Sequence, residues 1–460
     1  MKKLCTVSLF IFSFSLFTFS QITINTVAGN HSYGAGYIGD GKAATDAELN
    51  YPNAVVVDLS GNLYIADGSN NVIRKVNSSG TISTIAGYNA YGPGYSGDGG
   101  PATNAELNDP HGVMVDSHGN LYIADTYNQV IRVVNSSGVI GTLAGRYLGY
   151  GGDGGPATAA EFNEPEGLTF DILGNLYIAD NANNVVRKIS TAGIITTVAG
   201  NYAISFPSGG YSGDGGPATA AELKSPTGVT SDRYGNLYIA DGGNNVVRKI
   251  NTLGIISTYA GNHSHGYSGD GGNASAAELY NPSGVAMDTS GNLYIADTYN
   301  NVVRKVNSSG IIKTIVANHK VGYSGDGGLA IAAELYSPVG IALDRYFNLY
   351  IADVNNQVVR EVSDVEVASI PPSIAGNRQL TVYPNPSSGM FTFQIKNYEL
   401  GVRNLEVYNM MGQKVYNGTL NQAQGDNTIN LGNKPNGIYL YRITETNGNL
   451  VGEGKLVVER

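Results

Sequence analysis

Short apolar runs separated by turn-forming residues recur along most of the chain. The string Leu-Tyr-Ile-Ala-Asp occurs six times, beginning at Leu63, Leu121, Leu176, Leu237, Leu293 and Leu349. Successive copies lie 58, 55, 61, 56 and 56 residues apart, and such regular self-similarity is typical of a repeat architecture. The string is apolar at both odd and even positions, which favours a strand covered on both faces. The pattern therefore predicts an all-β repeat protein.

Each repeat predicts four short strands. In the second repeat they are residues 112–116, 120–124, 130–134 and 139–144, separated by Gly, Asn, Asp and Ser turns. A shared insert, Gly-Tyr-Ser-Gly-Asp-Gly-Gly-Pro-Ala-Thr-x-Ala-Glu-Leu in two of the repeats, precedes the first strand. Without it a repeat has about 40 residues, the usual size of a four-stranded propeller blade. We therefore expect a six-bladed β-propeller.

The two ends of the repeat region predict how the ring closes. The sixth repeat stops after its third strand, at Val362. A strand of the fourth type, residues 22–29, stands alone before any first strand. Pairing of the two would complete the last blade and leave no exposed edge. We therefore expect an N-terminal strand to close the propeller.

The repeat string extends to Gly-Asn-Leu-Tyr-Ile-Ala-Asp followed by Asn-Asn-Val-x-Arg-Lys-Val, and in this form it resembles the NHL-repeat propellers. The resemblance covers residues 22–362. The Asn-His-Leu triplet that names the family is replaced by strings such as Asn70-Asn71-Val72. The resemblance implies the propeller fold and leaves the activity open, because the family includes both interaction modules and enzymes.

The N-terminus predicts export. Two lysines within the first three residues precede an apolar run, and small residues at Thr18 and Ser20 suit cleavage before Gln21. Residues 1–20 are therefore predicted to be a secretory signal peptide, and residues 21–362 the propeller. No later segment reaches the length of a transmembrane helix. The single cysteine, Cys5, lies in the predicted signal, so no disulfide is expected in the mature protein.

The C-terminal part predicts a second, smaller domain. Residues 363–379 contain Pro371 and Pro372 among small polar residues, which indicates a linker. About seven short strands follow in residues 380–460, as expected for an antiparallel, Ig-like β-sandwich. Characteristic strings there are Tyr383-Pro384-Asn385-Pro386, Gly437-Ile438-Tyr439-Leu440-Tyr441 and Lys455-Leu456-Val457-Val458.

The order of these strings resembles the type A sorting domain of type IX secretion, found in bacteria of the Bacteroidota. The resemblance implies that the type IX secretion machinery is a partner. It also implies export through the periplasm and a protein that is secreted or held at the outer-membrane surface.

The charge of the propeller region excludes one class of partner. Residues 21–372 contain 17 Lys and Arg against 31 Asp and Glu, a net charge of −14. Nucleic-acid binding needs a basic surface, so we expect no nucleic-acid partner. Cations and neutral partners fit an acidic propeller better.

Each insert carries an aspartate that is a candidate Ca²⁺ ligand, because hard cations take oxygen ligands. The six are Asp40, Asp98, Asp153, Asp214, Asp270 and Asp326. A structural role is the favoured interpretation, since residues identical in every blade usually build the blade. One arginine per blade could pair with these acids: Arg74, Arg132, Arg187, Arg248, Arg304 and Arg360.

The position after the proline that opens each first strand differs from blade to blade. It is Asn53, His111, Glu166, Thr227, Ser283 and Val339 in turn. These residues are expected to line the mouth of the central channel, and the first five are candidate ligand-binding residues. His111 and Glu166 together offer the nearest approach to a metal or acid–base pair.

The longest loop between a fourth strand and its insert runs from Gly200 to Tyr211 and contains Ile204 and Phe206. Apolar residues that the blade pattern does not require suggest either a binding surface or local packing. No catalytic residue is assigned. The sequence favours an exported recognition or scaffold propeller that binds a protein or a glycan. The alternative is an extracellular propeller lyase or hydrolase with its site at the channel mouth.

Overall fold

The computed structural model describes residues 22–363, 379–383, 385, 387–396, 402–409, 413–421, 427–444 and 450–458. The chain divides into two compact units, Met1–Ser363 and Asp364–Arg460. The predicted signal peptide, residues 1–20, lies outside the described residues, as does nearly all of the predicted linker, residues 363–379. No helix in the described ranges is long and apolar enough to cross a membrane.

Six four-stranded antiparallel sheets make up most of the described part of the first unit. The first two are β2 (Pro52–Val57), β3 (Leu63–Asp67), β4 (Val72–Val76) and β5 (Ile82–Ala86), then β6 (Pro110–Val115), β7 (Leu121–Asp125), β8 (Val130–Val134) and β9 (Ile140–Ala144). The third and fourth are β12 (Pro165–Phe170), β13 (Leu176–Asp180), β14 (Val185–Ile189) and β15 (Ile195–Ala199), then β16 (Pro226–Ser231), β17 (Leu237–Asp241), β18 (Val246–Ile250) and β19 (Ile256–Ala260).

The fifth sheet consists of β20 (Pro282–Met287), β21 (Leu293–Asp297), β22 (Val302–Val306) and β23 (Ile312–Val316). The sixth combines β24 (Pro338–Leu343), β25 (Leu349–Asp353) and β26 (Val358–Val362) with β1 (Ile24–Ala28). A small parallel pair, β10 (Tyr147–Leu148) and β11 (Glu161–Phe162), lies in one insert. The strands predicted for the second repeat agree with β6 to β9 within two residues at each end.

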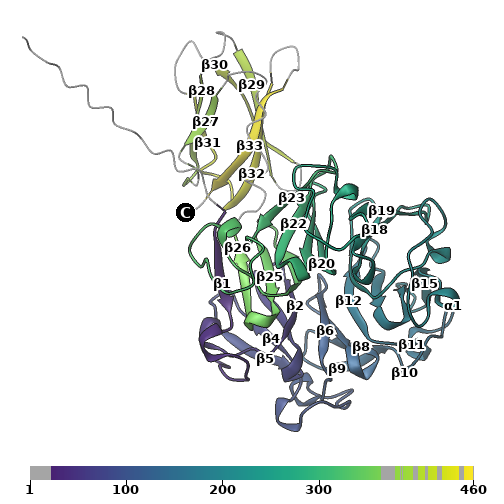
Figure 1. Cartoon of the computed structure of the whole chain (residues 1–460). Helices are drawn as coiled ribbons and strands as arrows, with labels where there is room; N and C mark the ends of the chain where they lie inside the picture. The colour runs from purple at the N-terminus through teal and green to yellow at the C-terminus, as the bar shows by residue number, and fades with distance from the viewer. Residues whose placement is uncertain are drawn as a thin grey trace, which may run out of the picture. The chain divides into compact units, whose positions relative to one another are not determined.

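The first strands of the six sheets form a closed ring. β2 contacts β6, β6 contacts β12, and the series continues through β16, β20 and β24 back to β2. Figure 1 shows β2, β6, β12 and β20 gathered around the middle of this unit, with outer strands such as β5, β9 and β19 farther out. Each sheet is therefore one blade, and the unit is a β-propeller as the repeats predict.

The N-terminal strand β1 completes the sixth blade. It pairs antiparallel with β26, with Ile24 opposite Val362 and Thr26 opposite Arg360. The side chains of Ile24 and Ala28 are fully buried. Because β1 comes from one end of the propeller sequence and β26 from the other, their pairing holds the ring shut. The predicted closure is confirmed.

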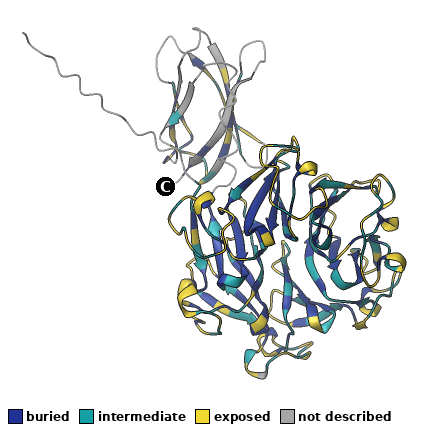
Figure 2. Cartoon of the chain, viewed as in Figure 1, coloured by how far each residue is buried: buried dark blue, intermediate teal, exposed yellow. Residues whose placement is uncertain are grey.

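The inserts fill the space between neighbouring blades. In the second repeat Ala102 and Leu107 are buried in one cluster with Ile73 of the first blade and Ile123 of the second. The Ala102 carbonyl accepts a hydrogen bond from the backbone N–H of Gly87, which follows β5. Figure 2 shows buried strands and exposed positions concentrated in the connecting loops. The inserts are therefore largely part of the packed structure.

Helices in the described residues are single turns. The α-helical one is α1 (Tyr202–Ser205). The inserts contain the 3₁₀ turns Ala44–Asp46, Ala102–Asn104, Ala157–Ala159, Ala218–Ala220, Ala274–Ala276 and Ala330–Ala332. A second set links second and third strands: Gly68–Asn70, Thr126–Asn128, Asn181–Asn183, Gly242–Asn244, Thr298–Asn300 and Val354–Asn356. Two more follow fourth strands, His31–Tyr33 and Asn89–Tyr91.

The second unit contains two sheets in its described residues. One has the order β27-β28-β31, from β27 (Gln379–Tyr383), β28 (Met390–Lys396) and β31 (Asn427–Asn430). The other has the order β30-β29-β32-β33, from β29 (Val402–Asn409), β30 (Lys414–Asn421), β32 (Gly437–Thr444) and β33 (Leu450–Val458). Phe391 and Phe393 of the first sheet share one core with Leu405 and Leu456 of the second. The unit is a small β domain of two packed sheets.

Candidate functional site

The repeated polar residues bind one another within each blade. Arg132 is fully buried; its Nη2 donates to Asp98 Oδ1 at 2.7 Å and its Nη1 donates to Asp125 Oδ2 at 3.3 Å. The ring centroid of Tyr95 lies 5.0 Å from Arg132 Cζ. The other five blades place Arg74, Arg187, Arg248, Arg304 and Arg360 in the same way, each between two aspartates and against a tyrosine.

The six insert aspartates, predicted as candidate Ca²⁺ ligands, therefore each face the arginine of their own blade. They are Asp40, Asp98, Asp153, Asp214, Asp270 and Asp326, and each accepts from an arginine Nη2 at 2.6 to 2.8 Å. Among the described residues no group of three or more His, Cys, Asp or Glu side chains could hold a metal ion. A Ca²⁺ role for these aspartates stays a prediction.

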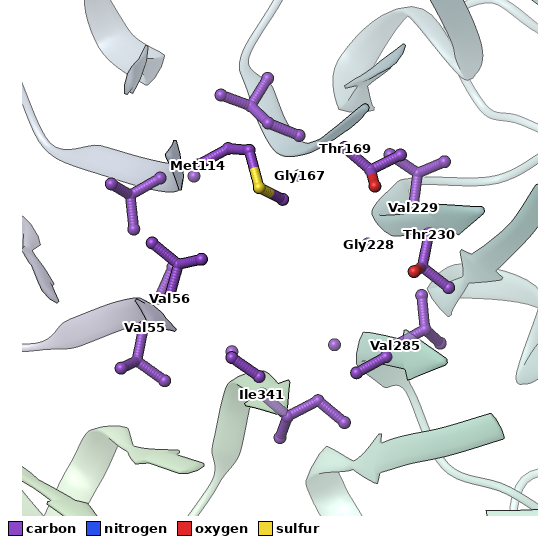
Figure 3. Close-up of a pocket in the computed structure, with 18 of the residues that line it drawn as sticks. Val55, Val56, Met114, Gly167, Thr169, Gly228, Val229, Thr230, Val285 and Ile341 are labelled. Atoms are coloured by element: carbon purple, nitrogen blue, oxygen red, sulfur yellow. The ribbon is translucent and has the colours of Figure 1, made fainter. Parts of the chain in front are cut away.

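The positions that differ from blade to blade surround one cavity. It has a volume of about 360 Å³ and is lined by the six first strands. All five predicted channel residues line it together with the sixth equivalent position: Asn53, His111, Glu166, Thr227, Ser283 and Val339. Figure 3 shows Met114, Thr169 and Ile341, from three different blades, around this space. The volume lies within the range of small-molecule pockets.

His111 and Glu166 lie side by side at the mouth where the first strands begin. His111 Nδ1 is 3.7 Å from Glu166 Oε1, and His111 Nε2 is 3.3 Å from Asp109 Oδ2. Asp109 Oδ1 also accepts a hydrogen bond from Asn53 Nδ2 at 3.4 Å. The ring of Tyr127 is centred 6.3 Å from the His111 ring. Residues of three blades thus meet in one polar cluster.

Burial and neighbouring charges shift the pKa values of this cluster. Burial raises the pKa of Glu166 to about 7; the neighbouring His111 opposes this rise, whereas the carboxylates of Glu164 and Asp109 add to it. Burial alone would lower the pKa of His111, but the hydrogen bond to Asp109 and the nearby carboxylates of Glu166 and Glu164 raise it overall. Glu166 therefore changes charge near neutral pH.

Asp109 and Glu164 are site residues that the sequence interpretation missed. Both have left-handed backbone conformations, with φ of 47° and 56°. Each is held by the preceding blade: the Asp109 N–H donates to Asn71 Oδ1 at 2.9 Å, and the Glu164 N–H donates to Gln129 Oε1 at 2.6 Å. The sequence did contain a signal, because the residue before the strand-opening proline also varies between blades, with serine in two of the six.

The equivalent hydrogen bonds continue around the ring. They run from Ser225, Asn281, Ser337 and Tyr51 to Asn184, Asn245, Asn301 and Gln357 in turn. The last of these hydrogen bonds joins the sixth blade to the first, so the six bonds form a closed set around the ring. Together they fix the spacing of the mouth residues.

Ile204 and Phe206 lie apart from this cluster, on the α1 loop that follows β15. Their side chains are 57% and 46% exposed. The ring of Phe206 is centred 4.9 Å from that of Tyr202, which in turn stacks on Tyr150 at 4.2 Å. Phe206 therefore contacts the ring of Tyr202 and stays about half-exposed.

Two family profiles match the chain. The family described as Teneurin NHL domain matches residues 31–95, 91–150, 206–268 and 263–324, about half of the chain. The family described as secretion system C-terminal sorting domain matches residues 381–459. The second match indicates that the protein is exported and has a secreted or cell-surface fate.

Relatives of known sequence share the repeat region. Teneurin-1 of Gallus gallus is 31% identical over 232 residues, and the Arabidopsis thaliana protein SUPPRESSOR OF QUENCHING 1, chloroplastic, is 26% identical over 269 residues. The alignments cover 46% and 57% of this chain but 8% and 25% of the relatives. The chain thus spans a quarter or less of the length of either relative.

Solved structures share the propeller fold. A structural genomics protein of unknown function from Bacteroides thetaiotaomicron superposes with a TM-score of 0.55 at 15% identity, covering 74% of this chain and 76% of that one. An auxiliary nutrient binding protein from the same organism gives a TM-score of 0.54 at 14% identity, over 75% and 76%. At these identities the likeness is evidence of the fold alone.

Proposed function

Since the chain belongs to the NHL-repeat family and ends in a secretion sorting domain, we propose that it is an exported recognition propeller whose ligand binds at the channel mouth. The ligand is a glycan or a protein that offers one residue or sugar unit to the cavity. His111 and Glu166 are the central contacts, with Asn53, Thr227 and Ser283 around them.

One observation carries this proposal: polar residues that repeat in every blade pair with one another, whereas those that vary converge on the cavity. A ring of equivalent positions is the natural place for a repeat protein to acquire specificity. The structural neighbour described as an auxiliary nutrient binding protein is an example of this fold in a protein described as binding a ligand.

The route of export follows from the two chain ends. Residues 1–20 direct the protein into the periplasm and are then removed. The type IX secretion machinery of a Bacteroidota bacterium recognises the C-terminal domain and moves the propeller outward, to the surface or the medium. Deleting residues 381–459 should retain the protein in the periplasm, as cell fractionation would detect.

Binding is tested with the chain lacking residues 1–20, on arrays of glycans and extracellular proteins. A ligand that loses about tenfold or more affinity in the double variant His111→Ala, Glu166→Gln supports the proposal. The matched control is His118→Ala, which follows the other end of the same strand β6. Ligands retained equally by all three proteins would place recognition away from the mouth.

A lyase or hydrolase is the second candidate, and the pKa of about 7 at Glu166 beside His111 favours it, because acid–base groups work best near the ambient pH. Screens on polysaccharides and lactones, with metal analysis of the purified protein, separate the two. Turnover lost in both His111→Ala and Glu166→Gln would replace recognition by catalysis. Binding without turnover supports recognition.

A further inference from the structure

The cavity below the mouth is apolar. Its next layer of side chains consists of Val55, Val113, Leu168, Val229, Val285 and Ile341. Figure 3 shows Val55, Val229, Val285 and Ile341 around the open space. No Lys or Arg belongs to the described residues that line the cavity. The walls below His111 therefore suit a hydrocarbon chain and carry no cationic side chain.

Two hydroxyl groups lie beyond this apolar layer. Thr169 on β12 and Thr230 on β16 occupy equivalent positions in neighbouring blades, where the other four blades have Val56, Met114, Ala286 and Ala342. The side chain of Thr169 is buried, with 6% of the residue exposed. Within the described residues neither hydroxyl has a hydrogen-bond partner. In Figure 3 both oxygens lie on the cavity side of their side chains.

Buried hydroxyls usually have a partner, because leaving one unpaired costs free energy. Thr169 is buried and Thr230 is half-buried, and both direct an unpaired hydroxyl into one cavity. The two groups therefore offer hydrogen bonds to a ligand group that accepts or donates them there. This observation is independent of the carboxylates at the mouth.

The mouth itself favours a positive charge. The imidazole of His111 lies 3.3 Å from Asp109 and 3.7 Å from Glu166, and the charge of Glu164 also acts on it. Even with His111 protonated, the carboxylates outnumber it whenever Glu166 is ionised. The half-exposed ring of Tyr127 at the edge of the cluster adds an aromatic surface, which attracts ammonium groups.

We propose that the channel binds a small organic cation: an ammonium group among the mouth carboxylates, an apolar chain along the valine and isoleucine layer, and a terminal polar group on Thr169 and Thr230. Glu166 and Thr169 are three residues apart on β12, so the two ends of the ligand are separated by about 10 Å. This inference rests on the proposed recognition function and specifies the unit that the ligand offers to the cavity, one that carries an ammonium group, an apolar chain and a polar end.

The test uses straight-chain probes of one length and the chain lacking residues 1–20. Calorimetry at pH 7.5 compares aminohexanol with hexanol, which lacks the charge, hexylamine, which lacks the hydroxyl, and hydroxyhexanoate, which reverses the charge. We expect aminohexanol to bind about tenfold or more tightly than hexanol, and hydroxyhexanoate to bind more weakly than either.

Variants test which residues bind each end of the probe. Glu166→Gln should reduce the affinity for aminohexanol about tenfold and leave the affinity for hexanol unchanged. Thr169→Val, which preserves the shape of the side chain, should reduce the affinity for aminohexanol to that for hexylamine. Thr169→Ser should retain the affinity for aminohexanol. His118→Ala is the matched control beyond the far end of β6 and should bind as the parent does.

Three outcomes would overturn the inference: no binding of aminohexanol at millimolar concentration, equal binding of all four probes, or affinities unaffected by Glu166→Gln and Thr169→Val. A neutral or anionic array ligand that still depends on His111 and Glu166 would also overturn it, while leaving the proposed recognition function standing. Array ligands whose affinity is the same for the parent and the mouth variants would overturn the proposed recognition site itself.

Discussion

The polar residues of the blades and those of the channel differ in what they face. Arg132 has no exposed surface and contacts two aspartates and a tyrosine ring of its own blade and insert. Glu166 is close to a single basic group, at 3.7 Å, and opens on a cavity. Both are charged groups largely removed from water, so the difference lies in their partners. The repeated arginines are paired with aspartates, although the buried Nε of each has no hydrogen-bond partner, whereas the varying residues face an open cavity.

This difference gives a rule for reading the molecule. A residue present in all six blades stabilises the ring, and removing it should lower stability without a specific effect on a ligand. A residue that varies at an equivalent position should affect binding more than stability. The predictions below test the rule from the part of the ring where the stability effect is largest to the part where it is smallest.

The closing strand should show the largest effect. Removing residues 21–29 from the chain lacking its signal leaves the outer edge of β26 unpaired and opens the space filled by Ile24 and Ala28. The propeller should melt roughly 10 °C or more below the parent, or aggregate. Thermal denaturation followed by circular dichroism measures this.

A peptide of residues 21–29 provides the control, because added strand should restore part of the lost melting temperature by mass action. An unchanged melting temperature after the deletion would mean that ring closure does not depend on β1.

The buried arginines should come second. Arg132→Met removes the charge that faces Asp125, which is itself fully buried, and should destabilise the propeller by about 3–5 kcal/mol. Urea denaturation measures the free energy of unfolding. Asp98→Asn is the matched control, because Asp98 is 45% exposed and its loss leaves Arg132 paired with Asp125. Its cost should be about 1 kcal/mol.

The parent and Asp98→Asn also test the Ca²⁺ prediction. If the insert aspartates only pair with arginine, the parent should melt at the same temperature in calcium chloride and in EGTA. A rise with calcium that Asp98→Asn abolishes would instead identify the inserts as cation sites, and the rule that repetition means structure would fail there.

An intermediate effect is expected from pH. Burial raises the pKa of Glu166 to about 7 from an ordinary value of 4.5, so the folded state holds that proton more tightly than the unfolded state does. Its contribution to stability is therefore complete below pH 4.5 and is lost as the pH rises through 7. His111, whose pKa is also raised, acts in the same direction.

Relative to Glu166→Gln, which does not titrate there, the parent should lose about 1–3 kcal/mol of unfolding free energy between pH 5 and pH 8. Asp46→Asn removes an exposed carboxylate and should follow the parent curve. Parallel curves for parent and Glu166→Gln would contradict the burial of Glu166 at the mouth.

The sequence predicts the fold and the mouth layer but not the deeper contacts. The repeat spacing, the orphan strand and the buried Leu-Tyr-Ile-Ala-Asp string are regular enough to define blades and closure. Thr169 could not be placed in this way, because the ladder between β12 and β13 shifts register between Pro165 and Leu168. Such a shift breaks the alternation from which side-chain direction is read.

Asp109 and Glu164 were missed for a related reason. A residue before proline favours an extended backbone, so neither was expected to turn toward the mouth. Their left-handed conformations depend on the hydrogen bonds from their N–H groups to Asn71 and Gln129 of the preceding blade. Contacts between blades form only when the ring closes. They therefore cannot be inferred from the local sequence.

The smallest effect on stability should come from the α1 loop. Ile204 and Phe206 occur in one blade only, and more than two fifths of each side chain is exposed, so the rule assigns them to recognition. Replacing both by Ser should change the melting temperature by about 2 °C or less, because surface substitutions usually stay within about 0.5 kcal/mol. Capture of a glycan or protein ligand should weaken, whereas aminohexanol, which occupies only the channel, should bind as before. Tyr202→Ala is the comparison, since Tyr202 stacks on Tyr150 and its loss should lower stability more. If the Ile204 and Phe206 variant instead melts far below the parent with ligand capture intact, the loop is packing and variation does not by itself mark a binding surface.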